Sequence, residues 1–182
     1  NYSFFDVKAN GEVELFDRWA ATDKRFTAAE QVSRTFAEAD WLRLDQDRRD
    51  AYTSGDNFTA SINADGSVTV AGVPTGWNAP ADYAGNLRQF DLIKQLHPEI
   101  NLGFALGGWT LSDEFSLAVD SEADRDAFTD NIIDIFKQYD FFNTVDFDWE
   151  YPGGGGESGN ASSPEDGVNF ALTLELLRGK LD

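Results

Sequence analysis

Apolar side chains recur along this chain at two spacings. Short apolar or alternating runs predict β-strands at residues 2–7, 101–107 and 142–149. Spacings of three and four predict three helices with these apolar faces: Leu87, Phe90, Ile93 and Leu96 in the first, Phe128, Ile132, Phe136 and Tyr139 in the second, and Phe170, Leu174, Leu177 and Leu181 in the third. Strands that alternate with helices are typical of parallel βαβ units, so we predict an α/β fold.

Local signals give the predicted helices defined ends. Pro98 ends the first helix. Ser121, with Asp124 three residues later, is a capping box that begins the second. The run Ser163-Pro164-Glu165 begins the third, because proline is favoured in a first helical turn.

The segment from Gly11 to about Tyr83 is charged and irregular. Within it, residues 61–70 predict a hairpin around Asp65-Gly66, and residues 27–43 predict a helix. A connection this long between core elements usually marks an elaboration near a binding site or a separate small fold. We therefore predict a long elaborated loop or small subdomain at about residues 11–83.

Composition limits the possible chemistry. The 182 residues are 41% hydrophobic and 14% aromatic, enough for one packed domain, and no run approaches the length of about 20 apolar residues that a membrane helix needs. There is no Cys, and His97 is the one His, which excludes thiolate metal sites, a Cys nucleophile and a complete set of metal-binding histidines. Catalysis, if present, must use carboxylates. We expect any secretion signal to lie outside this chain.

The net charge is −19, from 33 acidic and 14 basic residues. Such a chain repels nucleic acid and anionic membranes, so a neutral partner is favoured. Solubility, or adaptation to a salty medium, also accounts for this charge.

Three acids stand at every second position of an apolar run: Asp146, Asp148 and Glu150. On a strand they leave one face, roughly 6 to 7 Å apart. Crowded carboxylates in a closed site cannot all ionise cheaply, and Glu150, at the carboxyl end of the strand, is the natural proton donor. Three interpretations fit this row: a solvent-facing strand edge, a Mg²⁺ or Ca²⁺ site, or glycoside hydrolysis by carboxylates.

Residues 146–152, Asp-Phe-Asp-Trp-Glu-Tyr-Pro, resemble the catalytic strand of glycoside hydrolase family 18 chitinases, whose pattern is Asp-x-x-Asp-x-Asp-x-Glu. Residues 106–110, Leu-Gly-Gly-Trp-Thr, are similar to the third barrel strand of that family, Ser-x-Gly-Gly-Trp, and residues 1–6 are similar to its second. The three motifs occur in the family's order, and the resemblance covers the chain apart from the long segment after Asp17. It implies a (β/α)₈ TIM barrel of which this chain holds about strands 2–4 and their helices.

The resemblance also implies a reaction, the retaining hydrolysis of β-1,4-N-acetylglucosamine linkages in chitin with assistance from the substrate. Glu150 then protonates the glycosidic oxygen, while the N-acetyl carbonyl of the substrate attacks the anomeric carbon. Asp148 orients the acetamido nitrogen, and Asp146 shares a proton with Asp148. Neither a cofactor nor a metal is implied, and the expected partners are chitin or N-acetylglucosamine oligosaccharides.

Aromatic and small residues complete the predicted site. Trp109 and Tyr151 offer flat faces to sugar rings, and Tyr2 is expected deeper in the site. Gly103, Ala105 and Gly107 leave one face of the third barrel strand nearly bare, with room beneath a sugar ring, and Gly107 and Gly108 are expected to contact the substrate.

Two positions depart from the family pattern. Asn143 stands where the first Asp of the acidic motif is usual, and Ala105 replaces the Ser of Ser-x-Gly-Gly. We expect both residues to lie beneath Asp146. Because Asn143 cannot carry negative charge, we expect the acidic limb of activity to shift relative to relatives that have Asp there.

Two alternatives remain open at this stage. An endo-β-N-acetylglucosaminidase that acts on glycoprotein glycans shares the acidic motif, and a chitin-binding lectin can use the same barrel without catalysis. Glu150 argues against the lectin, which typically lacks the proton donor. We expect a secreted enzyme. Three strands and their helices would expose sheet edges and apolar faces, so we expect the isolated 182 residues to be inactive and to self-associate or await the rest of the barrel.

Overall fold

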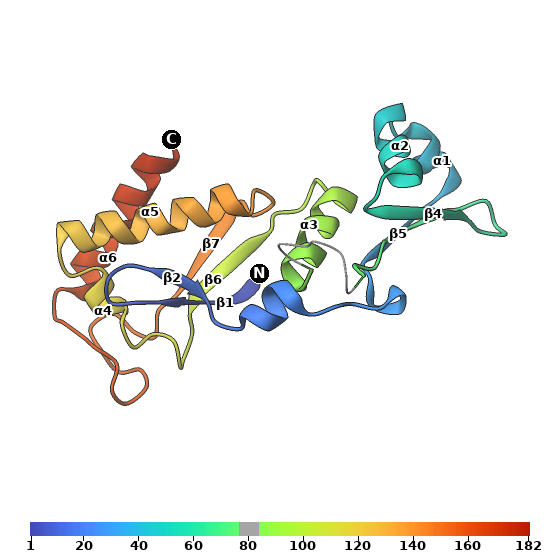
Figure 1. Ribbon diagram of the computed structural model, residues 1–182. Coiled ribbons are helices and arrows are strands. Elements are labelled where there is room, and N and C mark those ends of the chain that lie inside the picture. Colours follow the sequence, from blue (N-terminus) through green and yellow to red (C-terminus); the bar gives the residue numbers. More distant parts are fainter. Residues whose placement is uncertain (77–83) are drawn as a thin grey trace. The chain divides into compact units, whose positions relative to one another are not determined.

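The structure of this chain is a computed structural model that describes residues 1–76 and 84–182. It contains two compact units (Figure 1). Unit 1 consists of Asn1–Asp17 and Asn101–Asp182, and unit 2 consists of Arg18–Ile100. The predicted elaborated segment at 11–83 ends on residues 77–83, which lie outside the described residues, and it stays a prediction.

Unit 1 is built on a sheet with the strand order β2-β1-β6-β7. The three predicted strands are present as β1 (Tyr2–Val7), β6 (Gly103–Gly107) and β7 (Thr144–Asp148). β6 is parallel to both of its neighbours, which confirms the predicted parallel α/β pattern. β2 (Val13–Leu15) adds an antiparallel edge strand next to β1 that the sequence did not indicate.

The helices of unit 1 are α4 (Phe115–Ala118), α5 (Glu122–Gln138) and α6 (Asp166–Leu181). The capping box at the start of α5 is confirmed, since the Ser121 hydroxyl accepts a hydrogen bond from the Asp124 amide at 3.1 Å and the Asp124 carboxylate accepts one from the Ser121 amide at 3.1 Å. Rings from both α5 and α6 contact Phe147 of β7, so the two helices cover the same face of the sheet (Figure 1).

Aromatic rings fill the space between the sheet and this helix layer. Phe104 of β6 is fully buried, and its ring centroid lies 5.2 Å from those of Phe5 and Phe136 and 5.3 Å from that of Phe142. Aromatic pairs at these separations contribute about 0.5–1.5 kcal/mol each beyond the burial of their area. Side chains at alternate strand positions therefore hold the layers together.

The predicted apolar face of α6 is only partly right. Leu177 is buried, but Leu174 and Leu181 are 40% and 45% exposed. The buried side instead carries polar residues, among them Asn169, which accepts a hydrogen bond from Arg125 of α5 at 3.2 Å. Polar contacts between helices thus determine the rotation of α6, and apolar spacing alone does not reveal them.

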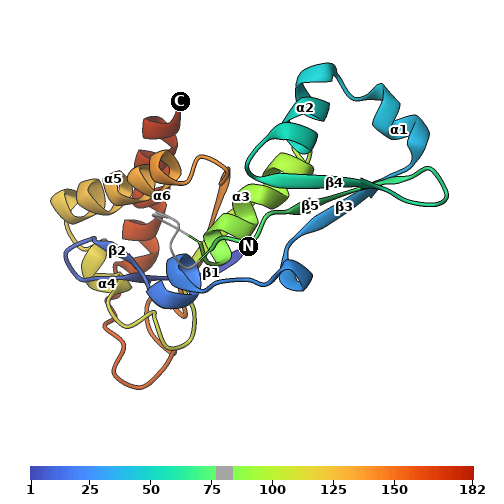
Figure 2. The same cartoon turned by 45° about the vertical axis from the view of Figure 1, so that its right-hand side comes forward.

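Unit 2 contains an antiparallel sheet with the strand order β3-β5-β4. Its elements, in chain order, are η1 (Trp19–Asp23), η2 (Ala28–Glu30), β3 (Ser33–Phe36), α1 (Glu38–Arg43), α2 (Gln46–Ser54), β4 (Phe58–Ile62), β5 (Val68–Gly72) and α3 (Asn86–Leu96). Figure 2 shows α2 and α3 beside this sheet. The predicted hairpin around Asp65-Gly66 is confirmed as β4 and β5, and Gly66 has a φ of +85° at its turn.

The predicted helix at residues 27–43 is right only at its end, where α1 forms, and wrong before it. This segment forms η2, then β3, then α1. In β3, Arg34 pairs with Val70 and Phe36 pairs with Val68, and the Phe36 side chain is only 4% exposed. Strand pairing and the burial of Phe36 outweigh the local helical preference of the segment.

The buried face of α3 is shifted from the predicted one. Leu87 and Leu96 are buried as expected, but Leu92 is fully buried while Phe90 and Ile93 are half-buried. Leu92 and Leu96 belong to the apolar core of unit 2, which also contains rings from α2, β3 and β4. This core therefore determines which face of α3 is buried.

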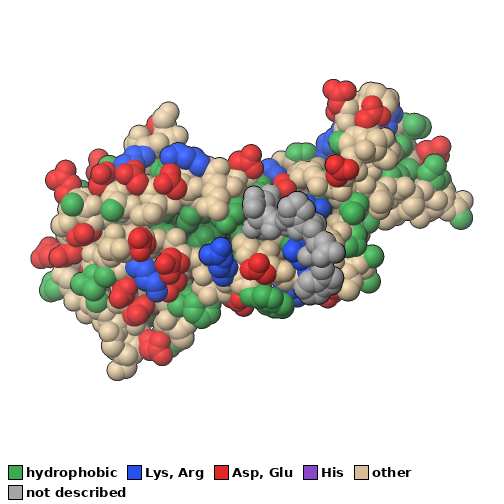
Figure 3. All heavy atoms as spheres, viewed as in Figure 1, with side chains coloured by type: hydrophobic (Ala, Val, Ile, Leu, Met, Phe, Trp, Pro, Cys, Tyr) green, Lys and Arg blue, Asp and Glu red, His purple; other side chains and the backbone are tan. Residues whose placement is uncertain are grey.

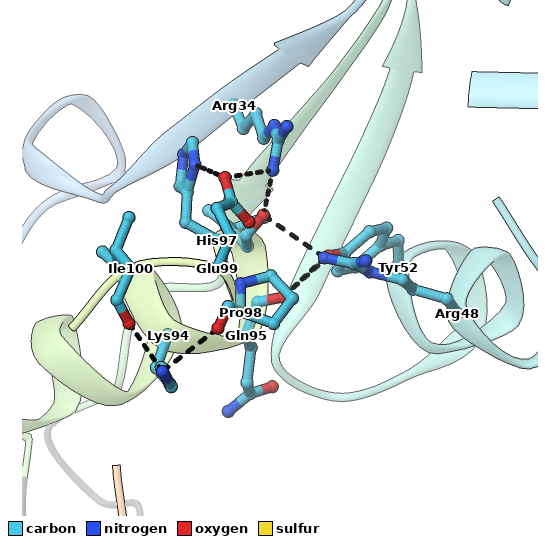
Figure 4. A network of polar contacts seen from close by, with 10 residues as sticks. Arg34, Arg48, Tyr52, Lys94, Gln95, His97, Pro98, Glu99 and Ile100 are labelled. Atoms are coloured by element: carbon cyan, nitrogen blue, oxygen red, sulfur yellow. Dashed lines mark hydrogen bonds and ion pairs between the residues drawn. The ribbon is translucent and has the colours of Figure 1, made fainter. Parts of the chain in front are cut away.

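Polar side chains gather at the C-terminal end of α3 (Figure 4). Arg34 Nη1 donates a hydrogen bond to the Leu96 carbonyl at 2.6 Å, and the Tyr52 hydroxyl donates one to the Gln95 carbonyl at 2.8 Å. Arg48 Nη2 also donates to the Gln95 carbonyl, at 3.4 Å. The last carbonyls of a helix have no partner within the helix, and cations are favourable at that end. These contacts fasten β3 and α2 to α3.

The surface is strongly acidic, in line with the net charge of −19. Figure 3 shows Asp and Glu side chains spread over the visible face and not gathered in one patch. In the described ranges 1–76 and 84–182, every helix is too short or too polar to cross a bilayer.

We expect Arg34→Ala to lower the free energy of unfolding by about 1–3 kcal/mol, because the Leu96 carbonyl loses the closer of its two arginine donors, at 2.6 Å, and keeps only Arg48 Nη2 at 3.5 Å. Arg43→Ala is the matched control, since the Arg43 side chain is 78% exposed and pairs with Asp40 three residues earlier, a surface pair worth at most about 0.5 kcal/mol. Urea unfolding of the full-length protein measures both losses, and hydrogen exchange of the α3 amides locates them. Equal losses in the two variants would contradict the capping role.

Candidate active site

The acids of β7 lie on the sheet face opposite α5 and α6. Phe147 contacts aromatic rings of these helices at centroid separations of 6.2 and 5.4 Å. Because side chains alternate along a strand, Asp146 and Asp148 leave the other face. In the parallel register they stand beside Ala105 and Gly107 of β6, respectively.

Trp149 holds the carboxyl end of β7 against the helix layer. Its ring stacks on Phe115 at 5.2 Å with an interplanar angle of 12°, meets Phe170 edge-on at 5.6 Å, and leaves only 5% of the residue exposed. Glu150 follows Trp149 at a bend beyond the carboxyl end of β7, where strand alternation no longer applies. Asp146 and Asp148 therefore share one face, and the Glu150 carboxylate is related to Asp148 through the Tyr151 hydroxyl, on which the charges of both acids act.

Tyr151 joins this group through its hydroxyl, which donates a hydrogen bond to the Glu150 carboxylate. That hydrogen bond, together with the negative charges of Glu150 and Asp148, raises the pKa of Tyr151 above its ordinary value. Tyr151 therefore remains protonated and acts as a donor at neutral pH. A hydroxyl donor and two carboxylates thus lie within reach of one small ligand.

Asp146 is exposed and accepts a hydrogen bond from Asn1 Nδ2 at 3.1 Å. The structure corrects the predicted place of Asn143 beneath it. Asn143 Oδ1 accepts from the Leu102 amide at 3.0 Å, and its Nδ2 donates to Asn101 Oδ1 at 2.8 Å. Asn143 precedes the first paired residue of β7, where its side chain can reach the neighbouring backbone, so it fastens the starts of the two strands.

The acids do not converge as metal ligands do. Among residues 1–76 and 84–182, no three or more His, Cys, Asp or Glu side chains are placed to hold a metal ion. Acids at alternate strand positions are spread along the strand, whereas a cation shell needs oxygens gathered within about 2.6 Å of one point.

β6 ends in a glycine turn that leads to an exposed aromatic residue. Gly107 and Gly108 have φ angles of +91° and +92°, a region that favours glycine. The Gly108 amide donates a hydrogen bond to the Asp148 carbonyl at 2.7 Å, which keeps the turn against β7. Trp109 follows directly and is 50% exposed, comparable to the 51% of Tyr151. Two predicted binding aromatics are therefore accessible to a ligand.

The glycine face of β6 is not open space, which corrects the predicted reason for its small residues. A Cβ atom at Gly103 would lie 2.1 Å from Thr144 Oγ1. One at Gly107 would lie 2.6 Å from the Phe115 ring and 2.7 Å from the Asp148 carbonyl oxygen. These glycines let neighbouring groups of the protein pack closely, and that space is not available beneath a sugar ring.

Tyr2 lies in the core, which corrects its predicted place in the site. It is 5% exposed, and its ring meets Phe5 at 5.6 Å, while Phe5 packs on Phe104 on the helix side of the sheet. A register shift in the β1–β6 pairing between Tyr2 and Phe5 lets both rings enter the same layer, which simple alternation does not allow. Burial, with smaller contributions from Asp17 and Tyr139, raises the pKa of Tyr2 to about 12.

Sequence reasoning missed the carboxylate that anchors the loop after Glu150. Asp166, in the first turn of α6, is fully buried and accepts hydrogen bonds from the Gly153 and Ser163 amides, each at 2.9 Å. The Ser116 hydroxyl donates to the same carboxylate at 2.6 Å. An acid at a helix start is so common that its position gave no sign of this role.

Ser112 is a second residue that sequence reasoning missed. It is fully buried, and its hydroxyl accepts a hydrogen bond from the Glu150 amide at 3.0 Å. A serine four residues after Gly108 has no distinctive pattern, so only the tertiary contact identifies it.

Comparison with known proteins agrees with this architecture. The chain matches the family model described as glycosyl hydrolases family 18 over residues 1–182. Chitinase 2 of Yersinia entomophaga is 42% identical over 108 residues, which are 58% of this chain and 17% of that protein. Chitinase A1 of Niallia circulans is 31% identical over 193 residues, covering 93% of this chain and 27% of that protein. The chain thus spans about a quarter or less of the length of these two relatives.

Solved structures show the same likeness. Chitinase ChiA74 from Bacillus thuringiensis has a TM-score of 0.61 and 26% identity, over 93% of this chain and 20% of that chain. The catalytic domain of chitinase B from Arthrobacter TAD20 has a TM-score of 0.71 and 23% identity, over 100% of this chain and 40% of that chain, a likeness of fold alone. The predicted fold class, part of an α/β catalytic domain, is confirmed.

We expect Gly107→Ala to destabilise the protein by at least about 2 kcal/mol more than Gly153→Ala. Both residues have positive φ angles, +91° and +84°, but a Cβ at Gly153 meets nothing within 4 Å, whereas one at Gly107 overlaps Phe115 and the Asp148 carbonyl. The control therefore isolates the backbone cost, about 1–2 kcal/mol. Urea unfolding gives both values, and equal costs would refute the close-packing role.

Tyr2 makes stability dependent on alkaline pH. Its pKa is about 12 in the fold against 10.0 for the ordinary group, so as pH rises the unfolded chain loses this proton first and unfolding is favoured. The contribution is complete below pH 10.0 and is lost as pH approaches 12. Between pH 9 and 12 we expect the wild type to lose about 2–3 kcal/mol more unfolding free energy than Tyr2→Phe. Parallel pH curves for the two proteins would be the contrary result.

Proposed function

The chain belongs to glycosyl hydrolases family 18, and on that premise we propose that the complete protein is a chitinase that hydrolyses β-1,4-linked N-acetylglucosamine polymers with retention of configuration. The observation that carries this proposal is the group of carboxylates at the carboxyl end of β7: Asp146 and Asp148 on one face of the strand, and Glu150 just after it, hydrogen-bonded to the Tyr151 hydroxyl on which the charge of Asp148 also acts. Glu150 stands beyond the carboxyl end of the strand, where parallel α/β folds place their working side chains. The relatives that match this chain are named chitinases, which supports the same substrate class.

In the proposed reaction Glu150 donates its proton to the glycosidic oxygen as the bond to the anomeric carbon breaks. The carbonyl oxygen of the substrate's own N-acetyl group attacks that carbon and forms an oxazolinium ion. Water then opens the ion while the Glu150 carboxylate takes up a proton, so two inversions retain the configuration. Asp148 orients the acetamido nitrogen and offsets the developing positive charge, and Asp146 shares a proton with Asp148.

The surroundings of the acids suit a sugar polymer. Trp109 and Tyr151 present half-exposed rings at the ends of neighbouring strands, and apolar faces of pyranose rings stack on such surfaces. A neutral polysaccharide is not repelled by a net charge of −19. The proposed chemistry requires no cofactor. We also propose that the enzyme is secreted, because an insoluble polymer is reached outside the producing cell.

Glu150→Gln in the full-length enzyme tests the proton donor. We expect kcat on chitin oligomers to fall by about 10²–10⁴-fold, because the amide cannot supply the proton. Oligomer affinity, measured by calorimetry, should change by less than about threefold. Glu157→Gln is the matched control, an exposed Glu on the following loop, and should retain wild-type kinetics.

The substrate class is tested with the wild-type enzyme. Cleavage of chitin oligomers but not of a high-mannose glycoprotein supports the chitinase assignment. The reverse result identifies an endo-β-N-acetylglucosaminidase, and binding of chitin oligomers without any cleavage identifies a lectin.

A further inference from the structure

The peptide groups of Glu150 lie beyond the sheet, yet both are satisfied. The β6–β7 ladder ends at the pair Gly107 and Asp148. Two residues later, the Glu150 amide donates to Ser112 Oγ at 3.0 Å, and its carbonyl accepts from Asn160 Nδ2 at 3.2 Å. Backbone groups outside regular structure need partners from backbone, side chains or water, and here side chains from two different loops supply both partners of one residue.

Ser112 replaces the missing ladder. Its fully buried hydroxyl shares its one proton between the Gly108 carbonyl at 2.8 Å and the Asp148 carbonyl at 3.2 Å, and it accepts a hydrogen bond from the Glu150 amide. One hydroxyl group therefore connects the turn after β6 with the peptide on either side of Trp149. The chain beyond the last strand pair is thus tied to the turn after β6 as far as Glu150.

The carbonyl side of Glu150 is held by an anchored loop. A Cβ atom at Gly156 would lie 1.8 Å from the Glu150 carbonyl oxygen, so the loop backbone packs directly on that group. The same loop carries Asn160, and the buried Asp166 carboxylate holds its start through the Gly153 amide. The partner of the carbonyl therefore has a defined position of its own.

We propose that Ser112 and Asn160 are positioning residues that aim the Glu150 carboxyl group by fixing the amide and the carbonyl of that same residue. Together these two groups determine the direction of the Cα–Cβ bond, and hence where the carboxyl proton is delivered. This inference rests on the proposed function of Glu150 as proton donor. A misplacement of about 1 Å in a catalytic group costs on the order of 10²-fold in rate.

The test compares two leaving groups in the full-length enzyme. In a chitin oligomer the leaving group is a hydroxyl of the next sugar, which needs the proton to depart. In a dinitrophenyl glycoside of the same oligosaccharide the leaving group is a stable phenolate, which departs without it. We expect Ser112→Ala to lower kcat for chitin oligomers by about 10- to 100-fold with little change in KM. For the dinitrophenyl glycoside, kcat should fall by less than about threefold. A general loss of structure cannot produce that difference.

Thr129→Val is the matched control for loss of a buried hydroxyl, since Thr129 is fully buried and donates only to the Arg125 and Asp126 carbonyls of its own helix. It should lower thermal stability without distinguishing the two substrates. Asn160→Ala, at a half-buried loop position, gives the same comparison if Ser112→Ala does not fold. Equal slowing of both substrates, or no more slowing than in Thr129→Val, overturns the positioning role. A wild-type enzyme that hydrolyses neither substrate overturns the proposed function instead.

Discussion

The packing of Trp149 between Phe115 and Phe170 is the contact on which the arrangement of the acids depends. A strand directs successive side chains to opposite faces, so a large ring held on the helix side forces its neighbours to the other side. Trp149 is 5% exposed, and emptying such a position typically costs about 3–5 kcal/mol. Thus the interaction that binds the helix layer to the sheet also directs Asp148 to the opposite face and holds the chain from which Glu150 follows.

The end of β7 is held differently from its middle. Up to Asp148 the strand is fixed by its ladder with β6, and beyond that point it is fixed by the Gly107-Gly108 turn and by one hydroxyl, that of Ser112. Only glycine permits this turn, because its φ angles are positive and Phe115 occupies the space of a side chain. Small residues near the site therefore serve close packing of the protein with itself.

Several of the few Lys and Arg side chains of this acidic protein bind carbonyl or carboxylate groups on neighbouring helices. Arg34 and Arg48 reach carbonyls at the C-terminal end of α3, and Lys180 pairs with Asp126 and Asp130 on α5. The acids of β7 have no such cation beside them among the described residues. In the proposed reaction the charge of Asp148 is therefore not offset by a neighbouring cation, which suits the stabilisation of a positively charged intermediate.

Interactions between residues close in sequence made several strands, turns and helix ends predictable. Alternation along a strand put Asp146 and Asp148 on one face, and the capping chemistry of Ser121 fixed the start of α5, because both depend on residues within a few positions. Contacts distant in sequence decided the rest: a register shift took Tyr2 into the core, pairing with β5 turned the segment around Phe36 into a strand, and Ser112 met a residue 38 positions later. No local pattern records such contacts, because their free energy exists only once the chain has folded.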